Sequence, residues 1–236
     1  MTPFLRAALV AIPLAVFSPH AWAQASAEVQ ATQAAAKKGD AAAQYRLGEM
    51  HDLGQGVPQD YKAAVQWYRR AAQQGHAQAQ FALAEMYKNG DGVTKDMQEA
   101  VRWYQRSAKQ GNAGAQLLLG VLYESGVGVP ADLGTAAKWY RRSADQGDAR
   151  AMLLLGNFYQ LGQGLPRDTV AAYALYSLSA AAEASPNNPS LGHRAQMEQG
   201  MRPDEVEAGK RLAAAMSRPG SFSRALDEHL SGAAKR

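Results

Sequence analysis

Histidine is the residue in this chain best suited to proton transfer or metal binding, but its distribution indicates neither. Beyond the N-terminal segment it occurs at four scattered positions: His51, His76, His193 and His229. The chain has no His-Glu-x-x-His, Ser-x-x-Lys or Gly-x-Ser-x-Gly motif and no cysteine. It therefore lacks the signatures of zinc hydrolases, penicillin-recognising serine enzymes and thiol catalysts. We expect no catalytic residue, no metal ligand and no cofactor.

Four Gly-x-Gly pairs are the other motif with a chemical interpretation, because glycine-rich loops cradle phosphates. The pairs begin at Gly54, Gly90, Gly126 and Gly162. A dinucleotide fingerprint needs a strand before it and a third glycine that opens a helix, and none of the pairs has that context. A helix end followed by a turn explains all four pairs.

The glycine pairs recur every 36 residues, and many other residue types recur with them. The recurring columns include Gly39, Gly75, Gly111 and Gly147; Leu47, Leu83, Leu119 and Leu155; Asp60, Asp96, Asp132 and Asp168; and Trp67-Tyr68, Trp103-Tyr104 and Trp139-Tyr140. A fixed period with no β pattern indicates an all-α solenoid. In each unit we expect a first helix (helix A) up to the Gly-x-Gly pair and a second (helix B) capped by the recurring aspartate. The Trp-Tyr pairs indicate packing between repeats rather than sugar stacking.

The repeated pattern resembles a known family. Ala-x-Ala-Gln-x-x-Leu-Gly, then Gly-x-Gly-Val-Pro, Asp, and Ala-x-x-Trp-Tyr-x-x-Ala-Ala are similar to the SEL-one-like repeat, a relative of the tetratricopeptide repeat, over residues 39–182. The resemblance implies a right-handed superhelical solenoid of antiparallel helix pairs, with helix A lining a concave groove. It also implies an adaptor or scaffold role. The fourth copy departs from the pattern, because Leu175 replaces tryptophan and Ser177-Leu178 replaces the basic pair.

The two ends of the chain predict a signal peptide and two caps. Arg6, the uncharged residues 7–17 and Ala21-Trp22-Ala23 have the layout of an export signal, so we expect cleavage of residues 1–23. The apolar run is shorter than the roughly 20 residues that cross a bilayer. We expect a periplasmic or secreted protein without a transmembrane segment. Residues 24–38 predict an N-terminal capping helix. Residues 183–236 predict a C-terminal helical cap and tail, in which a helix from Pro203 covers helix B of the fourth repeat.

The variable positions of the repeats indicate where a partner binds, because constant columns pack and variable columns face water or a ligand. On helix A, positions 42, 46, 49 and 53 and their equivalents lie on one helical face. The candidate partner-binding residues on this stripe are Arg46, Glu49, Glu85, Leu118, Val121, Leu154, Asn157 and Leu161. The stripe changes from charged to apolar along the array. Its apolar part either binds a partner or is filled by residues 186–202.

Charge separates the remaining function classes. A net charge of +4 is too small to indicate nucleic-acid binding. The polar columns of helix B form a basic ridge, which we interpret as a solvated face: Lys62, Arg69, Arg70, Arg102, Arg106, Lys109, Lys138, Arg141 and Arg142. The sequence thus predicts an exported adaptor or scaffold that binds a peptide or helix of a protein partner. The alternatives are an envelope-associated structural protein that uses the basic ridge on an anionic surface and, less favoured, a cell-wall or β-lactam hydrolase.

Overall fold

The computed structural model describes the backbone of residues 19–233 and the side chains of residues 27–232, and all regular structure in them is α-helical. These residues form twelve helices and no strand. Their bounds are α1 Pro19–Lys37, α2 Ala41–Leu53, α3 Tyr61–Gln73, α4 Ala77–Asn89, α5 Met97–Lys109, α6 Ala113–Ser125, α7 Leu133–Ala144, α8 Ala149–Leu161, α9 Thr169–Ala182, α10 Pro189–Gly200, α11 Pro203–Met216 and α12 Phe222–Ala233.

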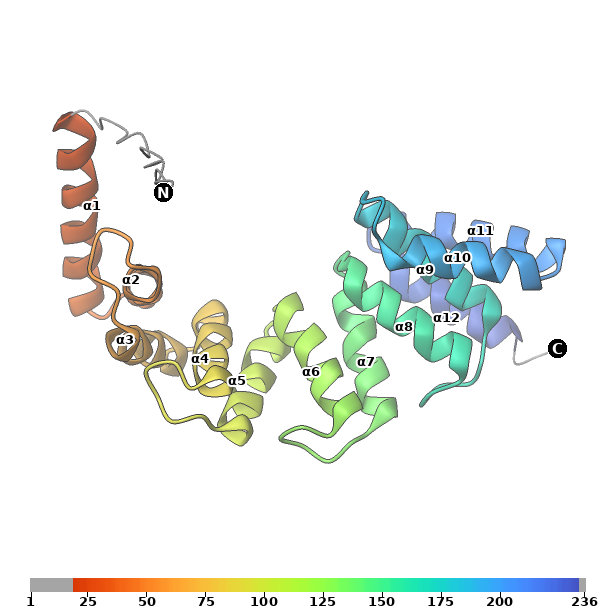
Figure 1. Ribbon diagram of the computed structural model, residues 1–236, viewed down its shortest axis with the longest axis horizontal. Helices are drawn as coiled ribbons and strands as arrows, with labels where there is room; N and C mark the ends of the chain where they lie inside the picture. The colour runs from red at the N-terminus through yellow and green to blue at the C-terminus, as the bar shows by residue number, and fades with distance from the viewer. Residues whose placement is uncertain (1–18, 234–236) are drawn as a thin grey trace, which may run out of the picture.

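Helices α2 to α9 form four helix pairs that stack in chain order. Helix A of the predicted repeats is α2, α4, α6 and α8, and helix B is α3, α5, α7 and α9. Each of these helices packs against the next one in the chain. The pairs follow a curved path with α1 at one end and α10 to α12 at the other (Figure 1). The predicted helical solenoid is confirmed.

The 36-residue register is visible in the helix ends. Every helix A ends on the first glycine of a Gly-x-Gly pair, with φ between 67° and 90°. That left-handed conformation disfavours a side chain. Every helix B is capped by its aspartate, as when Asp60 Oδ1 accepts a hydrogen bond from the Ala63 amide at 3.0 Å. These caps confirm that the glycine pairs are helix ends.

Tyrosine, rather than tryptophan, forms the core between the two helices of a repeat. Tyr68, Tyr104, Tyr140 and Tyr176 are at most 2% exposed. They pack so closely on helix A that a Cβ on Gly120 would lie 2.4 Å from the Tyr140 ring. The tryptophans lie further out, and each has the guanidinium of the arginine three residues later stacked over it at 4.4–4.7 Å.

Buried glutamines join consecutive repeats. Gln80 Nε2 donates to the Ala72 carbonyl at 3.0 Å, and its Oε1 accepts from Gln110 Nε2 at 2.7 Å. Gln44 and Gln116 make the equivalent contacts. Each glutamine therefore links the end of the preceding helix B to the end of its own helix B. A hydrogen bond of this kind contributes about 0.5–1.5 kcal/mol.

Helix α1 packs as a helix B, and the described residues 19–233 contain no helix A that pairs with it. Gln44 Nε2 donates to the Ala36 carbonyl at 3.1 Å, which repeats the Gln80–Ala72 contact 36 residues earlier. Gly56 packs against Val29 in the same way that Gly128 packs against Val101. Helix α1 spans most of residues 24–38, where a capping helix is predicted, and begins at Pro19, inside the predicted signal peptide. Residues 1–18 of that signal lie outside the described residues.

The C-terminal helices cover the last repeat. Helices α10 and α11 pack on α9, and α12 packs on α11. The helix predicted to start at Pro203 is α11, and its Gly209 approaches Tyr173 so closely that a Cβ would lie 2.5 Å from the ring. Helix α10 packs mainly on α9. Its Gln196 and Met197 also line a hollow with Gln160 at the end of α8. That residues 186–202 fill the apolar part of the helix A stripe stays a prediction.

Candidate partner-binding surface

The eight predicted partner-binding residues lie on the four A helices, and each keeps some solvent exposure. Arg46 and Leu161, at opposite ends of the array, are fully accessible, and Leu161 is 63% exposed. The other six are half-buried: Glu49, Glu85, Leu118, Val121, Leu154 and Asn157. The structure thus places the predicted residues on one helix type along the whole solenoid, with an accessible edge in every repeat.

The apolar residues of the stripe also pack at the edge of the core. Leu118 contacts the buried cluster of the first repeats, and Val121 and Leu154 contact that of the last repeats. Their inner atoms stabilise the solenoid, while their outer atoms stay in water. Leu53 and Leu161 end the first and last A helices and are 60% and 63% exposed. These two leucines are the apolar stripe residues most free to bind a partner.

The polar residues of the stripe are held by tyrosine hydroxyls. Glu85 accepts a hydrogen bond from Tyr104, and Asn157 Oδ1 accepts one from Tyr176 at 2.7 Å. Burial of the phenol raises the pKa of Tyr176 to about 12, so it remains a donor at neutral pH. Both pairs are 19 residues apart. That spacing has meaning only once the packing of helix B on helix A is known, so the sequence did not reveal it.

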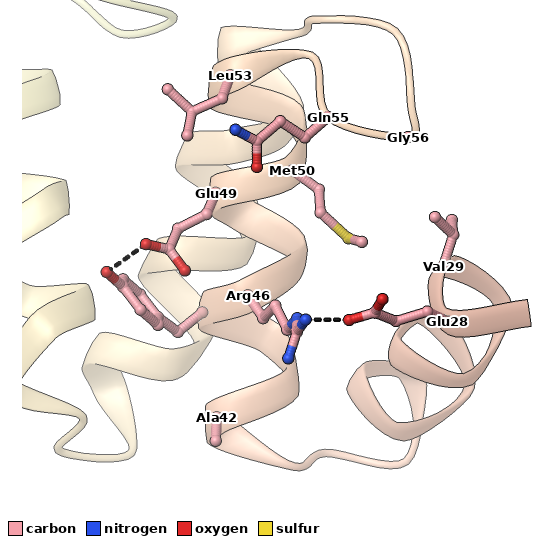
Figure 2. A pocket seen from close by; sticks show the side chains of 10 residues that line it. Glu28, Val29, Ala42, Arg46, Glu49, Met50, Leu53, Gln55 and Gly56 are labelled. Carbon is pink, nitrogen blue, oxygen red and sulfur yellow. Dashed lines mark hydrogen bonds and ion pairs between the residues drawn. The ribbon is translucent and has the colours of Figure 1, made fainter. Parts of the chain in front are cut away.

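A groove with a volume of about 620 Å³ lies between α1 and α2 on this surface (Figure 2). The predicted residues Arg46 and Glu49 lie along one wall, and Arg46 forms an ion pair across the groove with Glu28 of α1. The rest of the lining includes Val29, Ala42, Tyr45, Met50, Leu53, Gln55 and Gly56. Glu28, Val29 and Met50 were not predicted, because their approach depends on how α1 packs against α2.

A second, polar hollow of about 520 Å³ lies among the start of α9, α11 and α12. There His229 Nε2 lies 2.9 Å from Asp168 Oδ2, a pairing that the sequence did not predict. Burial on its own would raise the pKa of Asp168, but hydrogen bonds from His229 and the Ala171 amide outweigh it and hold the pKa below its ordinary value. The residues that line this hollow include no serine, threonine or cysteine. The pair ties α12 to the N-terminus of α9.

The part of the chain that the structure describes contains no group of three or more metal-binding side chains. No helix within residues 19–233 is both long and apolar enough to cross a membrane. Several arginines of the basic ridge are engaged internally. Arg69 Nη2 donates to the Tyr87 hydroxyl at 3.0 Å, and Arg141 pairs with Asp227 of α12 at 2.7 Å.

Stacked helix pairs with a repeated accessible face define a helical-repeat protein of the solenoid class. The Sel1 repeat family matches four consecutive segments, residues 41–76, 77–112, 113–148 and 149–183. The chain belongs to the Sel1 repeat family. Sel1 repeat proteins generally mediate protein–protein interactions and are typically non-catalytic scaffolds.

Solved structures show the same architecture. The chain is 34% identical to c5321, a protective antigen present in uropathogenic Escherichia coli strains that displays an SLR fold, with a TM-score of 0.71 over 80% of this chain and 41% of that one. It thus spans less than half of the E. coli protein. A Sel1 repeat protein from Oxalobacter formigenes is 38% identical, with a TM-score of 0.63 over 67% of both chains. Comparison with curated proteins gives no significant match.

Proposed function

We propose that this protein is an exported adaptor or scaffold that binds a peptide or helix of a partner protein on its helix A stripe. One observation carries the proposal: the stripe keeps exposed or half-buried side chains through all four repeats, and in the last two these include Leu118, Val121, Leu154 and Leu161. Burial of one exposed leucine side chain by a partner contributes about 1.5–3 kcal/mol. A few such contacts are enough to dominate an interface.

The test compares substitutions of two exposed aliphatic residues in the same chain. Leu161→Asp places a charge on the stripe, and Val127→Asp places the same charge on a loop residue outside it that is 46% exposed. Both variants should keep wild-type helicity because neither side chain is core. Leu161→Asp is expected to weaken capture of envelope proteins by the immobilised chain, whereas Val127→Asp leaves capture unchanged. Equal capture by both variants would remove this end of the stripe from the interface.

Export is the second part of the proposal, and it rests on the charge and apolarity of residues 1–23. Intact-mass measurement of the exported protein is expected to show Gln24 as its first residue. An exported pool that retains Met1 would contradict the cleavage site. Processing would leave α1 with residues 24–37. These still include Ala36 and Glu28, which contact Gln44 and Arg46 of α2.

The two alternative functions have less support. A β-lactam hydrolase of the serine type needs a hydroxyl nucleophile beside its base, and the residues that line the hollow of Asp168 and His229 include no serine or threonine. The basic ridge is partly neutralised, because Arg102 pairs with Glu99 and Arg141 with Asp227. Binding to anionic vesicles that disappears at moderate salt would favour envelope association through the remaining cations.

A further inference from the structure

Among the described helices, α1 has one packing partner, whereas every other helix B of the array has at least two. Each of α3, α5 and α7 packs between its own helix A and the helix A of the next repeat, whereas α1 packs on α2 alone among the described helices. The side of α1 and α2 that faces away from the array is the groove in Figure 2. This end of the solenoid therefore presents the surface that an additional helix A would cover.

Burial along the repeat columns supports this description. Val29 is half-buried, while Val65 and Val101 at the same position of inner repeats are each 3% exposed. Met50 is also half-buried, while its equivalents Met86, Leu122 and Phe158 are between 1% and 8% exposed. The residues that gain exposure are apolar. The groove is thus continuous with the interface that joins each repeat to the one before it.

We propose that the groove between α1 and α2 binds an α-helix of a partner protein, seated where a further helix A would pack on α1. This rests on the proposed function and names the partner's form. The contact between neighbouring A helices of this chain indicates which side chains the partner helix carries. The Phe81 ring of α4 lies 3.4 Å from the position that a Cβ on Gly114 of α6 would take. Ala42 occupies the column of Gly114. The partner helix therefore places an aromatic or leucine side chain over Ala42.

The repeated residue columns of this chain's own A helices indicate further features of the partner helix. The residue at the Phe81 column is Tyr45, Phe81, Leu117 or Leu153, and three residues later the chain has glycine or alanine. Thr32 stands on α1 where inner repeats have the core tyrosine. The groove rim carries the carboxylates of Glu28 and Glu49 and the guanidinium of Arg46. A helix with a large apolar residue, a small residue one turn on and a basic flank fits this lining.

A separate chain suits the groove better than the segment before Pro19. In each repeat a seven-residue connection, such as residues 54–60, reverses the chain between helix A and helix B. The equivalent residues before α1 are 18–24, and from Pro19 onward they are helical. The residues that would form the reversing connection are therefore part of α1 from Pro19 onward.

The test uses a peptide with the sequence of α4, residues 77–89, made helical by a side-chain lactam because isolated helices of this length are marginal in water. Its fluorescence anisotropy is measured against the full chain. Saturable binding is expected. Ala42→Trp fills the groove and is expected to weaken binding at least about tenfold, as blocking a central interface contact does. Gln78→Trp, at the equivalent exposed position of the second repeat, is the matched control and leaves binding unchanged.

Each other result overturns the inference. Absence of binding, or equal loss in Ala42→Trp and Gln78→Trp, would exclude the groove as the helix site. Loss in Leu161→Asp with full binding in Ala42→Trp would place the helix on the apolar part of the stripe and leave the proposed function intact. Binding that appears only after removal of residues 1–23 would make that segment the occupant. Leu53→Lys, at a 60% exposed lining position, repeats the measurement if Ala42→Trp lowers helicity.

Discussion

At the scale of single residues, a small side chain at one column of helix A sets how closely the two helices of a repeat pack. Gly48, Gly120 and Gly156 occupy this column, and Ala84 takes it in the second repeat. The core tyrosine of helix B fills the space that a side chain there would need. Because interiors are close-packed, the column tolerates little added volume.

Gly120→Val is therefore expected to lower the free energy of unfolding by about 1–3 kcal/mol, because its side chain meets the buried Tyr140 ring. Gly192→Ala in α10 is the matched control, since nothing lies within 4 Å of the added Cβ. It is expected to stabilise the protein by up to about 1 kcal/mol through helix propensity. Urea unfolding followed by circular dichroism measures both. A Gly120→Val variant as stable as wild type would contradict the close-packing explanation.

Residue columns in the sequence predicted the caps and the buried tyrosines, because each of these is local or strictly periodic. They did not predict the bonds that break the period. His229 and Asp168 are 61 residues apart and belong to different elements. The sequence did not predict the ion pair of Glu28 with Arg46 for the same reason, because it depends on how α1 packs. Helix α1 carries none of the Trp-Tyr residues that mark other B helices.

At the scale of elements, α12 is held to the array by buried apolar side chains, Phe222 and Leu226, and by charged contacts beside them. Arg141 of α7 pairs with Asp227, and the Asp145 carboxylate accepts a hydrogen bond from the Ser223 amide at 3.1 Å in the first turn of α12. The Ser221 hydroxyl, just before α12, donates to the Ala215 and Arg218 carbonyls of the preceding segment. The cap of α12 therefore comes from the third repeat.

This attachment predicts that α12 detaches in acid before the repeats unfold. The hydrogen bond from Arg141 holds the pKa of Asp227 below its ordinary value of 3.8, and contacts with His229 and the Ala171 amide hold that of Asp168 below it as well. A lowered folded-state pKa stabilises the docked state above the ordinary value, and this stabilisation is lost as pH falls through the folded-state pKa. Hydrogen exchange of the α12 amides should therefore accelerate below about pH 4, while α3 to α7 stay protected.

Asp227→Asn is expected to accelerate hydrogen exchange of the α12 amides already at neutral pH, because it removes the ion pair with Arg141. Glu183→Gln, at an exposed position of the α9 C-terminus, is the control and keeps the wild-type profile. Simultaneous loss of protection in α12 and in the repeats would show that docking and global folding are one transition.

At the scale of the whole molecule, the two ends of the solenoid are finished differently. Within the described residues, the N-terminal end has one helix beyond the repeats, α1, beside the groove, whereas the C-terminal end has three. The sequence indicated this asymmetry in the fourth repeat, where Val170, Ala174 and Leu178 replace the polar ridge of helix B. Ala174 is fully buried in the structure. A repeat array exposes core wherever stacking stops, so its end repeats need a cover.

Truncation after Ser185 tests that requirement. It removes α10 to α12 and with them five large side chains buried against the last repeat: Met197, Leu212, Met216, Phe222 and Leu226. Each buried side chain of this size contributes about 1.5–3 kcal/mol. Because about 1 kcal/mol shifts the Tm of a chain this long by roughly 2–4 °C, the Tm should fall by more than about 10 °C. Truncation after Gly220 removes α12 alone and is expected to give an intermediate Tm. Because repeats contribute nearly additively, the loss should be confined to α8 and α9 in hydrogen exchange. A chain ending at Ser185 that matches the full chain in solubility and Tm would show that the fourth repeat is stable without its cover.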